Sequence, residues 1–195
     1  MGINPLERND TAWQKTLGLH DWYEATPDSP YSLGSVQMLG KLQGTMVKAA
    51  RPWVPLWALD FLTRHSLDMF LLTEDLPLRH NRVTVDNGRI RVHWTPNNLR
   101  AHSELTAKVS KAVKRSGYPI VLTERMGIAS SSHMCGTATA GTDPAASVLD
   151  PSCRSHDVEN LWIVDSSFFP SSGGLNPALT IAANALRVAP SITRS

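Results

Sequence analysis

Apolar and polar side chains alternate along residues 82–86 and again along residues 89–94. Alternation with a period of two is typical of a β-strand that buries one face. The dipeptide Asn87-Gly88 joins the two runs, and it readily takes the two positive φ angles of a type I′ turn. The pattern therefore predicts a β-hairpin. The face expected to point to the core carries Ile90, Val92 and Trp94.

A helical period follows the predicted hairpin. Asn97 or Asn98 is available as the N-cap, and Gly117 is a natural stop. Basic residues near the predicted C-terminus suit the negative end of the helix dipole. A further strand is predicted over residues 120–123. The apolar face of the predicted helix consists of Leu99, Leu105, Val109 and Val113.

The first part of the chain has a weaker pattern. Residues 1–32 show no period and are expected to form an irregular segment over a core. Residues 33–46 allow a helix, although three glycines interrupt it. The leucines that follow Pro55 predict a helix leading into a short strand at residues 69–72.

The last third of the chain differs from the rest in amino-acid composition. Residues 127–146 are rich in Ser, Gly, Thr and Ala, a composition that commonly folds around a ligand. Residues 161–165 are typical of a buried strand, and a loop of small residues follows over 166–176. Residues 177–189 predict a helix with Pro177 in its first position and Asn176 as the cap. Strand, loop and helix N-terminus together outline an anion or cofactor site.

Composition narrows the class of protein. The chain has 195 residues, with 42% apolar and 18% charged residues, which fits neither a disordered nor a fibrous chain. A net charge of +2 argues against nucleic-acid binding driven by bulk charge. The two cysteines are too few for a disulfide framework, and neither a signal-peptide pattern nor a membrane span is visible. The expectation is a soluble, cytoplasmic protein.

Two kinds of chemistry can be read from clusters in the last third. Two imidazoles and two thiols form a possible structural zinc set, although the spacing is loose. Ser130-Ser-Ser132 beside His133 suggests a hydrolase, but no Gly-x-Ser-x-Gly elbow occurs. The possible zinc ligands are His133, Cys135, Cys153 and His156.

A third interpretation is redox chemistry. His133 lies in one glycine-bearing loop and Asn176 lies in another, just before a helix. If the two loops face each other, an imidazole would take a hydroxyl proton and an amide would orient the same oxygen. The alternatives are that Asn176 is a plain N-cap and that Asp165 is a capping acid at the end of a strand.

Several longer motifs occur in a particular order along the chain. They are Glu74-Asp-Leu-Pro77, Asn81-Arg-Val83, His133-Met-Cys-Gly-Thr137, Ser147-Val-Leu-Asp-Pro151, the stretch 158–167, Pro170 and the stretch 174–180. This set resembles the C-terminal region of glucose-methanol-choline (GMC) flavoprotein oxidoreductases. The likeness is strong over about residues 69–189.

The resemblance implies a reaction and a set of site residues. His133 matches the family's active-site histidine, which acts as base toward the alcohol hydroxyl, and Asn176 matches the position that hydrogen-bonds the substrate oxygen. Asp165 and Ser166 match the strand end whose backbone approaches FAD, while Asn176 and Pro177 match the turn beside the flavin ring. The reaction implied is FAD-dependent oxidation of a CH–OH donor, with hydride passing to flavin N5.

The resemblance also implies a fold. It is an α+β fold that combines part of an antiparallel substrate-domain sheet and its helices with the final strand and helix of an FAD-binding domain. Residues 1–130 would be a partial substrate-binding domain, and residues 131–195 would be the C-terminal segment of the FAD-binding domain that carries the active-site residues.

Two departures from the family pattern concern FAD. The family usually has a basic residue, Met and Gly where this chain has Ala138-Thr-Ala-Gly141. No Gly-x-Gly-x-x-Gly motif occurs, and that motif binds the dinucleotide pyrophosphate. The expected partners are therefore a small-molecule alcohol and a missing N-terminal FAD-binding half. The alternative is a non-enzymatic module that depends on a partner or on zinc.

Overall fold

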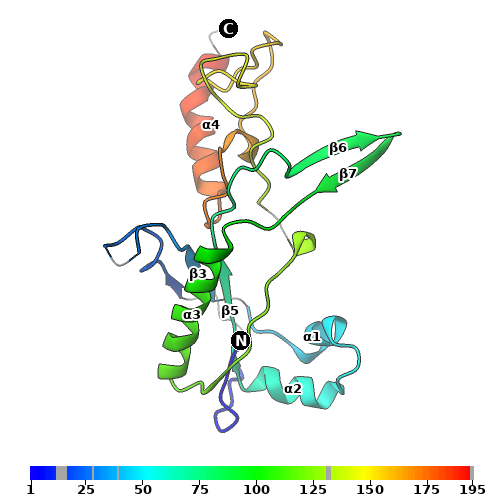
Figure 1. Ribbon diagram of the computed structural model, residues 1–195, viewed down its shortest axis with the longest axis vertical. Helices are drawn as coiled ribbons and strands as arrows, with labels where there is room; N and C mark the ends of the chain where they lie inside the picture. Colours follow the sequence, from blue (N-terminus) through cyan, green and yellow to red (C-terminus); the bar gives the residue numbers. More distant parts are fainter. Residues whose placement is uncertain (12–16, 28, 39, 131–132, 194–195) are drawn as a thin grey trace. The chain divides into compact units, whose positions relative to one another are not determined.

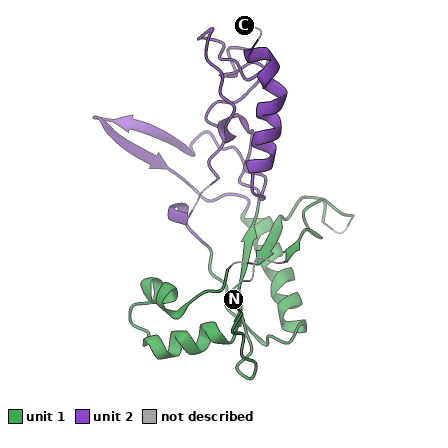
Figure 2. Ribbon diagram, turned by 180° about the vertical axis from the view of Figure 1, so that it is seen from behind, with its two compact units in different colours: residues 1–73, 99–125 green, residues 74–98, 126–195 purple. Residues whose placement is uncertain are grey.

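The computed structural model describes residues 1–11, 17–27, 29–38, 40–130 and 133–193. The chain forms two compact units, which Figure 2 shows in different colours. Unit 1 comprises residues 1–73 and 99–125, and unit 2 comprises residues 74–98 and 126–195. Helices and antiparallel sheets occur together, so the chain is α+β, as the sequence predicts.

The described residues of unit 1 form two small antiparallel sheets, whose labelled strands can be followed in Figure 1. The first has the order β4–β1–β8, and the second has the order β2–β3–β5. In the second sheet Ser35 lies opposite Leu72, and Met38 lies opposite Met69. The strands are β1 (Gly2–Ile3), β2 (Gly18–Leu19), β3 (Ser35–Met38), β4 (Ser66–Leu67), β5 (Met69–Leu72) and β8 (Ile120–Val121).

The helix predicted over residues 33–46 is wrong. Residues Ser35–Met38 form strand β3, and helix α1 (Gly44–Ala50) begins only at Gly44. Pairing with β2 and β5 satisfies the backbone of β3 on both sides, whereas a helix over residues 33–46 would contain three unfavourable glycines. Leu39, in the same predicted range, lies outside the described residues.

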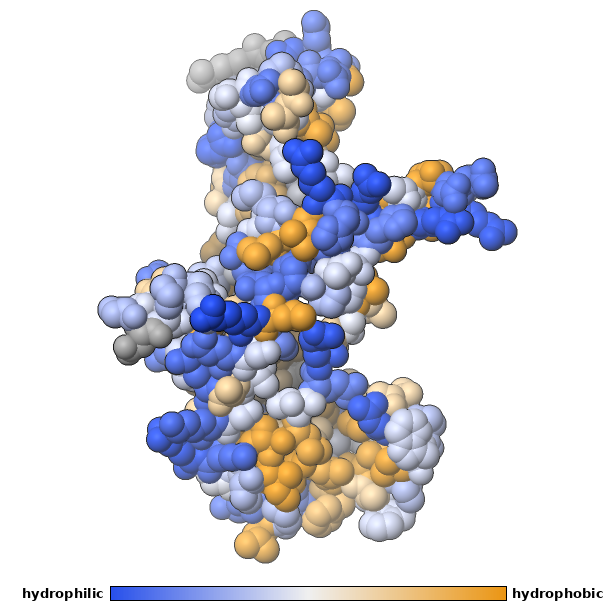
Figure 3. Space-filling view, in the orientation of Figure 1, coloured by the Kyte–Doolittle hydropathy of each residue, from blue (hydrophilic) through white to orange (hydrophobic). Residues whose placement is uncertain are grey.

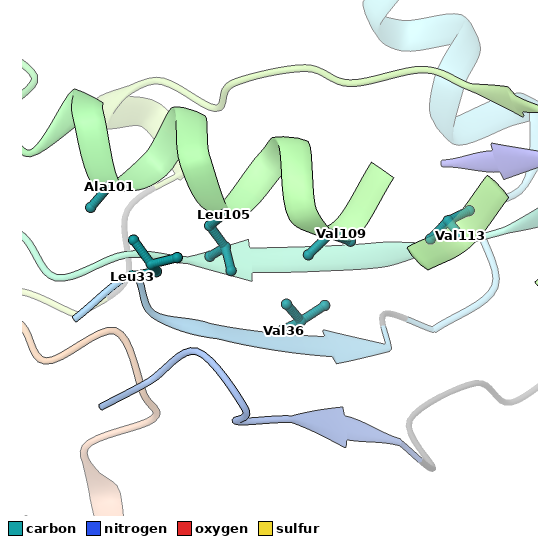
Figure 4. Packing of buried hydrophobic residues seen from close by; sticks show 6 residues of the cluster. All are labelled: Leu33, Val36, Ala101, Leu105, Val109 and Val113. Carbon is teal, nitrogen blue, oxygen red and sulfur yellow. The ribbon is translucent and has the colours of Figure 1, made fainter. Parts of the chain in front are cut away.

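The core of unit 1 lies between helix α3 (Leu99–Arg115) and the β2–β3–β5 sheet, as Figure 4 shows. The apolar face that the sequence predicts for this helix is buried from Leu105 onward, and Leu99 stays exposed. Burying large aliphatic side chains contributes about 1.5–3 kcal/mol each, so this stripe holds the helix to the sheet. The buried residues of the cluster are Leu33, Val36, Ala101, Leu105, Val109 and Val113.

The predicted end of helix α3 and the predicted position of helix α2 agree with the structure. Helix α3 ends before Gly117, whose φ of +93° suits glycine. Helix α2 (Leu56–Arg64) leads into β5, as predicted. The side-chain amides of Asn97 and Asn98, however, donate to the carbonyls of Leu76 and Glu74, respectively. These bonds hold the residues just before α3 against residues 74–76.

The hairpin predicted in unit 2 is confirmed. Strands β6 (Arg82–Asp86) and β7 (Arg89–His93) pair antiparallel, and Asn87 and Gly88 have φ values of +50° and +74°. The prediction that Ile90 and Val92 face the core is wrong, because Ile90 is 74% exposed and Val92 is also exposed. The described residues of unit 2 leave this face open. Figure 3 accordingly shows apolar and polar side chains together on the hairpin.

A second core holds the rest of unit 2 together. Ala138, Leu149, Cys153 and Val188 are buried there, and Val188 belongs to helix α4 (Ala178–Ile192). The described residues also form two short 3₁₀ helices, η1 (Ile128–Ser130) and η2 (Ser166–Phe168). Half-buried residues packed on this core are Trp162, Ile163, Val164 and Phe168.

The strand predicted over residues 161–165 is wrong. The segment makes one isolated bridge, between Arg154 and Trp162. Its neighbour is a tight turn in which the Asp150 carboxylate accepts from two backbone amides and Cys153 has a φ of +60°. A turn of this kind offers too short an extended edge for a ladder, so the apolar segment packs without becoming a strand.

None of the helices in the described ranges has both the length and the apolar character that crossing a membrane requires.

Candidate active site

The loop that carries His133 is irregular and partly covered. His133 and Cys135 are half-buried, and Met134 is exposed. Gly136 has a φ of +82°, a backbone angle that favours glycine. A Cβ at this position would meet only the Phe169 carbonyl oxygen, at 3.8 Å, so the backbone angle rather than crowding explains the glycine.

Two hydrogen bonds tie this loop to the 3₁₀ helix η2. The hydroxyl of Ser166 donates to the Met134 carbonyl at 2.7 Å. The amide of Ala138 donates to the Ser167 carbonyl at 3.1 Å. Two segments that the sequence singles out, one around His133 and one around Asp165 and Ser166, are therefore adjacent in space.

Asp165 holds the η2 turn in place. Its carboxylate accepts from the Ser167 amide at 2.9 Å and from the Ser167 hydroxyl. These two hydrogen bonds stabilise the carboxylate and lower the pKa of Asp165 below its ordinary value. The alternative reading of Asp165 as a capping acid is confirmed, although it caps a 3₁₀ turn and not the end of a strand.

The segment before helix α4 is hydrogen-bonded to residues 74–75, the first residues of unit 2. Asp75 and Ser172 exchange two backbone hydrogen bonds, of 2.9 and 3.1 Å. The Ser171 hydroxyl donates to the Glu74 carboxylate at 2.5 Å. Gly174, with a φ of +66°, turns the chain toward Asn176.

Helix α4 begins one residue later than predicted. It starts at Ala178, and Pro177 occupies the cap position, already with helical φ and ψ. Asn176 is exposed and lies immediately before this cap. No side-chain hydrogen bond comes from the cap residue, and the first turn contains no acidic residue. The positive end of this helix is therefore not neutralised by its own first turn.

A polar cluster around Asp75 was not found from the sequence. The Asn97 amide nitrogen donates to the Asp75 carboxylate at 2.5 Å, and the Asn97 amide oxygen accepts from the Leu76 backbone at 2.9 Å. Burial, and then the charge of Asp75, raise the pKa of the Cys135 thiol. The only available signal was the Glu74-Asp-Leu-Pro77 motif, which does not show that Asn97 folds back onto it.

The zinc interpretation gains no support. Within the described ranges, which include all four proposed ligands, no three His, Cys, Asp or Glu side chains group as a metal site. His156 Nε2 lies 3.1 Å from both the Ser147 hydroxyl and the Gly141 carbonyl oxygen. Cys153 is buried, and its sulfur accepts from the Asn184 amide at 3.4 Å. Of the serines in the hydrolase interpretation, 131 and 132 lie outside the described residues.

A surface hollow of about 460 Å³ lies in unit 1 and is not the candidate site. Its lining comes from the outer side of helix α3 and includes none of the predicted site residues. The lining residues are Ala107, Ser110, Lys111, Lys114 and Arg115.

Comparison of the chain with known proteins identifies its family. The family model described as GMC oxidoreductase matches residues 77–185, which is more than half of the chain. The match covers the hairpin, the His133 loop, the η2 turn and the first half of helix α4.

Known relatives agree with the family match. Paromamine 6'-oxidase of Streptomyces fradiae is 41% identical over 98 residues, which are 50% of this chain and 18% of that protein. The 2-methyl-1,2-propanediol dehydrogenase of Mycolicibacterium austroafricanum is 31% identical over 143 residues, 67% of this chain and 26% of that protein. The fructose dehydrogenase large subunit of Gluconobacter japonicus is 30% identical over 145 residues, with the same two shares. The chain thus spans about a quarter or less of the length of these relatives, and it belongs to the GMC oxidoreductase family.

Proposed function

We propose that the chain supplies the substrate-side active-site residues of an FAD-dependent enzyme that oxidises a CH–OH group to a carbonyl. The observation that carries this proposal is the pair of hydrogen bonds that hold the His133 loop against the Asp165–Phe168 turn. Both segments lie within the residues that the family match covers. Bonds that fix the backbone next to His133 support a role in general base catalysis, which requires a positioned side chain.

The proposed substrate is a small molecule that bears hydroxyl groups. The relatives are named for paromamine, a propanediol and fructose, all of which are hydroxyl compounds. In the proposed reaction His133 takes the hydroxyl proton, and the Asn176 carboxamide donates a hydrogen bond to the same oxygen. Histidine is the side chain that most often acts as a general base, so it is suited to accept that proton.

The residues around helix α4 fit the proposed cofactor, FAD. The first turn of α4 has no acidic residue, and its cap gives no side-chain hydrogen bond, so its backbone amides suit the electron-rich edge of a flavin. Asn176 and Pro177 would lie by that edge, and the backbone at Asp165 and Ser166 would approach the rest of the cofactor. When bound, FAD supplies the acceptor for the hydride.

The domain assignment is also part of the proposal. Residues 1–130 are assigned to a partial substrate-binding domain, and residues 131–195 to a segment of the FAD-binding domain. The compact units divide the chain differently, because residues 74–98 fold with residues 126–195. This grouping is compatible with a site to which both assigned domains contribute, since Asp75 and Ser172 are hydrogen-bonded to each other.

We further propose that a second polypeptide segment, carrying the dinucleotide-binding motif, completes the FAD site. The surface of α4 supports this. Leu179 and Leu186 are 84% and 76% exposed, and Ala182 and Ala183 between them are exposed too. The only charged residue of the helix, Arg187, donates to the Pro151 carbonyl instead of lining this stripe. A helix that is apolar on two sides is typically covered on both.

Reconstitution tests this completing segment. The probe is the part of Streptomyces paromamine 6'-oxidase that this chain does not match, co-expressed with the 195-residue chain. We expect FAD to be retained in the co-purified pair, as flavin absorbance, and poorly retained by either part alone. Replacing Leu179 and Leu186 with Glu should abolish co-purification, while the control Leu6→Glu, at a 94% exposed leucine of unit 1, should not.

Substitution of His133 tests the reaction. In the reconstituted FAD-bound enzyme, His133→Ala should lower kcat by about 10² or more, because the general base is lost. His80→Ala is the matched control, since His80 is an exposed histidine of the same unit. Equal turnover of the two variants would remove His133 from the proposed role.

A further inference from the structure

The hydroxyl of Ser166 performs a task that is separate from the backbone role proposed above. It donates to the carbonyl of Met134 at 2.7 Å, and Met134 directly follows His133. Ser166 is half-buried, whereas Met134 is 60% exposed, so this bond lies at the surface of the unit. We propose that Ser166 is a positioning residue whose hydroxyl fixes the backbone from which the His133 imidazole projects. This inference rests on the proposed role of His133.

The arrangement of bonds around the loop supports this task. The loop between His133 and Ala138 contains no helix or strand, and Gly136 bends it with a φ of +82°. Its near end is held by the Ser166 hydroxyl, and its far end is held by the bond from the Ala138 amide to the Ser167 carbonyl, at 3.1 Å. Both bonds lead to the same three-residue helix η2. Loss of either bond therefore removes one of the two links between the loop and η2.

The neighbouring serine has a different task. The Ser167 hydroxyl donates to the Asp165 carboxylate, which also accepts from the Ser167 amide at 2.9 Å. These bonds stay within the turn and hold its shape. Asp165 therefore holds the shape of η2, and η2 positions the Ser166 hydroxyl. That hydroxyl in turn fixes the backbone of Met134, next to His133.

We call the Ser166–Met134 hydrogen bond, which holds the His133 loop against η2, the clamp. Hydrogen exchange in the full 195-residue chain tests it without cofactor or activity. The readout is the Ala138 amide, whose protection reports whether the loop stays attached to η2. A typical hydrogen bond stabilises by about 1 kcal/mol, so Ser166→Ala should speed this exchange roughly fivefold. Ser166→Thr, which restores a hydroxyl, should return it to the original rate.

Ser147→Ala is the matched control. The hydroxyl of Ser147, a half-buried residue of the same unit, also donates to a carbonyl at 2.7 Å, that of the exposed Asp143. This control should leave the Ala138 amide unchanged. Unchanged exchange in Ser166→Ala, or equal acceleration in both variants, would overturn the proposal. Melting of both variants followed by circular dichroism shows whether the unit stays folded.

A kinetic readout separates the clamp from the proposed function. In the reconstituted FAD-bound enzyme, Ser166→Ala should lower kcat about fivefold while KM changes little, with rescue by Ser166→Thr. If His133→Ala leaves turnover intact while Ser166→Ala still speeds Ala138 exchange, the clamp stands and the proposed function fails. If His133→Ala abolishes turnover while Ser166→Ala changes neither exchange nor kcat, the function stands and the clamp is overturned.

Discussion

Gly34 lies directly against the carbonyl of Leu72. A Cβ built on Gly34 would sit 2.1 Å from the Leu72 carbonyl oxygen, and the φ of Gly34 is +126°. The next residue, Ser35, is paired with Leu72 in the β3–β5 ladder. The close approach and the backbone angle both require glycine, so this contact fixes where strand β3 starts.

Replacing this glycine should destabilise unit 1. We expect Gly34→Ala to lower the free energy of unfolding by about 2–4 kcal/mol, through strain at a positive φ and the clash with backbone. The control is Gly40→Ala, where a Cβ meets nothing within 4 Å and the φ is not in the left-handed region. It should change stability by less than about 1 kcal/mol. Urea unfolding of both variants makes the comparison, and similar losses would contradict the structure.

The core of unit 2 can be tested with two leucines. Leu149 is 0% exposed and packs in the second core, while Leu179 is 84% exposed on helix α4. Leu149→Ala should cost about 2–5 kcal/mol because it leaves a cavity. In the isolated chain Leu179→Ala should cost less than about 0.5 kcal/mol. Thermal and urea unfolding measure both, and a large loss for Leu179→Ala would show that its surface is already covered.

His102 should make stability depend on pH. The Thr73 hydroxyl lies 3.3 Å from His102 Nδ1, and burial, and then Arg125, lower the pKa of His102 below its ordinary 6.5. The folded state therefore favours the neutral imidazole, and the unfolded state binds the proton more readily. This contribution is complete above pH 6.5 and is lost as the pH falls from there through the lowered pKa.

Unfolding in urea between pH 8 and pH 5 measures this effect. His102→Gln should be less stable at pH 8 and should lose less stability on acidification than the original chain. His80→Gln, at an exposed position, is the control and should keep the original slope. Parallel slopes for His102→Gln and the original chain would refute the assignment.

The two thiols should react in a definite order. Cys135 is half-buried, and burial and the nearby Asp75 raise the pKa of its thiol, which reduces the thiolate fraction. Cys153 is 1% exposed. At pH 8 iodoacetamide should label Cys135 slowly and Cys153 only after unfolding in urea. Mass spectrometry of the digested chain gives both rates, and labelling of Cys153 first would be incompatible with the second core.

The candidate site divides into parts that the sequence revealed and parts that it did not. His133, Asp165 and Ser166 stand out because small residues around them form recognisable motifs. The bonds from Ser166 to Met134 and from Asn97 to Asp75 join residues 32 and 22 positions apart. No spacing rule predicts such contacts, because they depend on how loops fold back on each other. The meeting of His133 and Asn176 stays a prediction.

What the sequence determined by itself is local. Asn87-Gly88 set the hairpin turn, and the period of apolar residues set helix α3, because turn angles and helix faces depend on neighbouring residues only. Tertiary structure decided the rest. Residues 35–38 became a strand because β2 and β5 pair with them, and residues 161–165 did not because their neighbour is a turn. Ile90 is exposed although its pattern suits burial, since alternation shows which face is apolar and only a packed partner decides whether that face is covered.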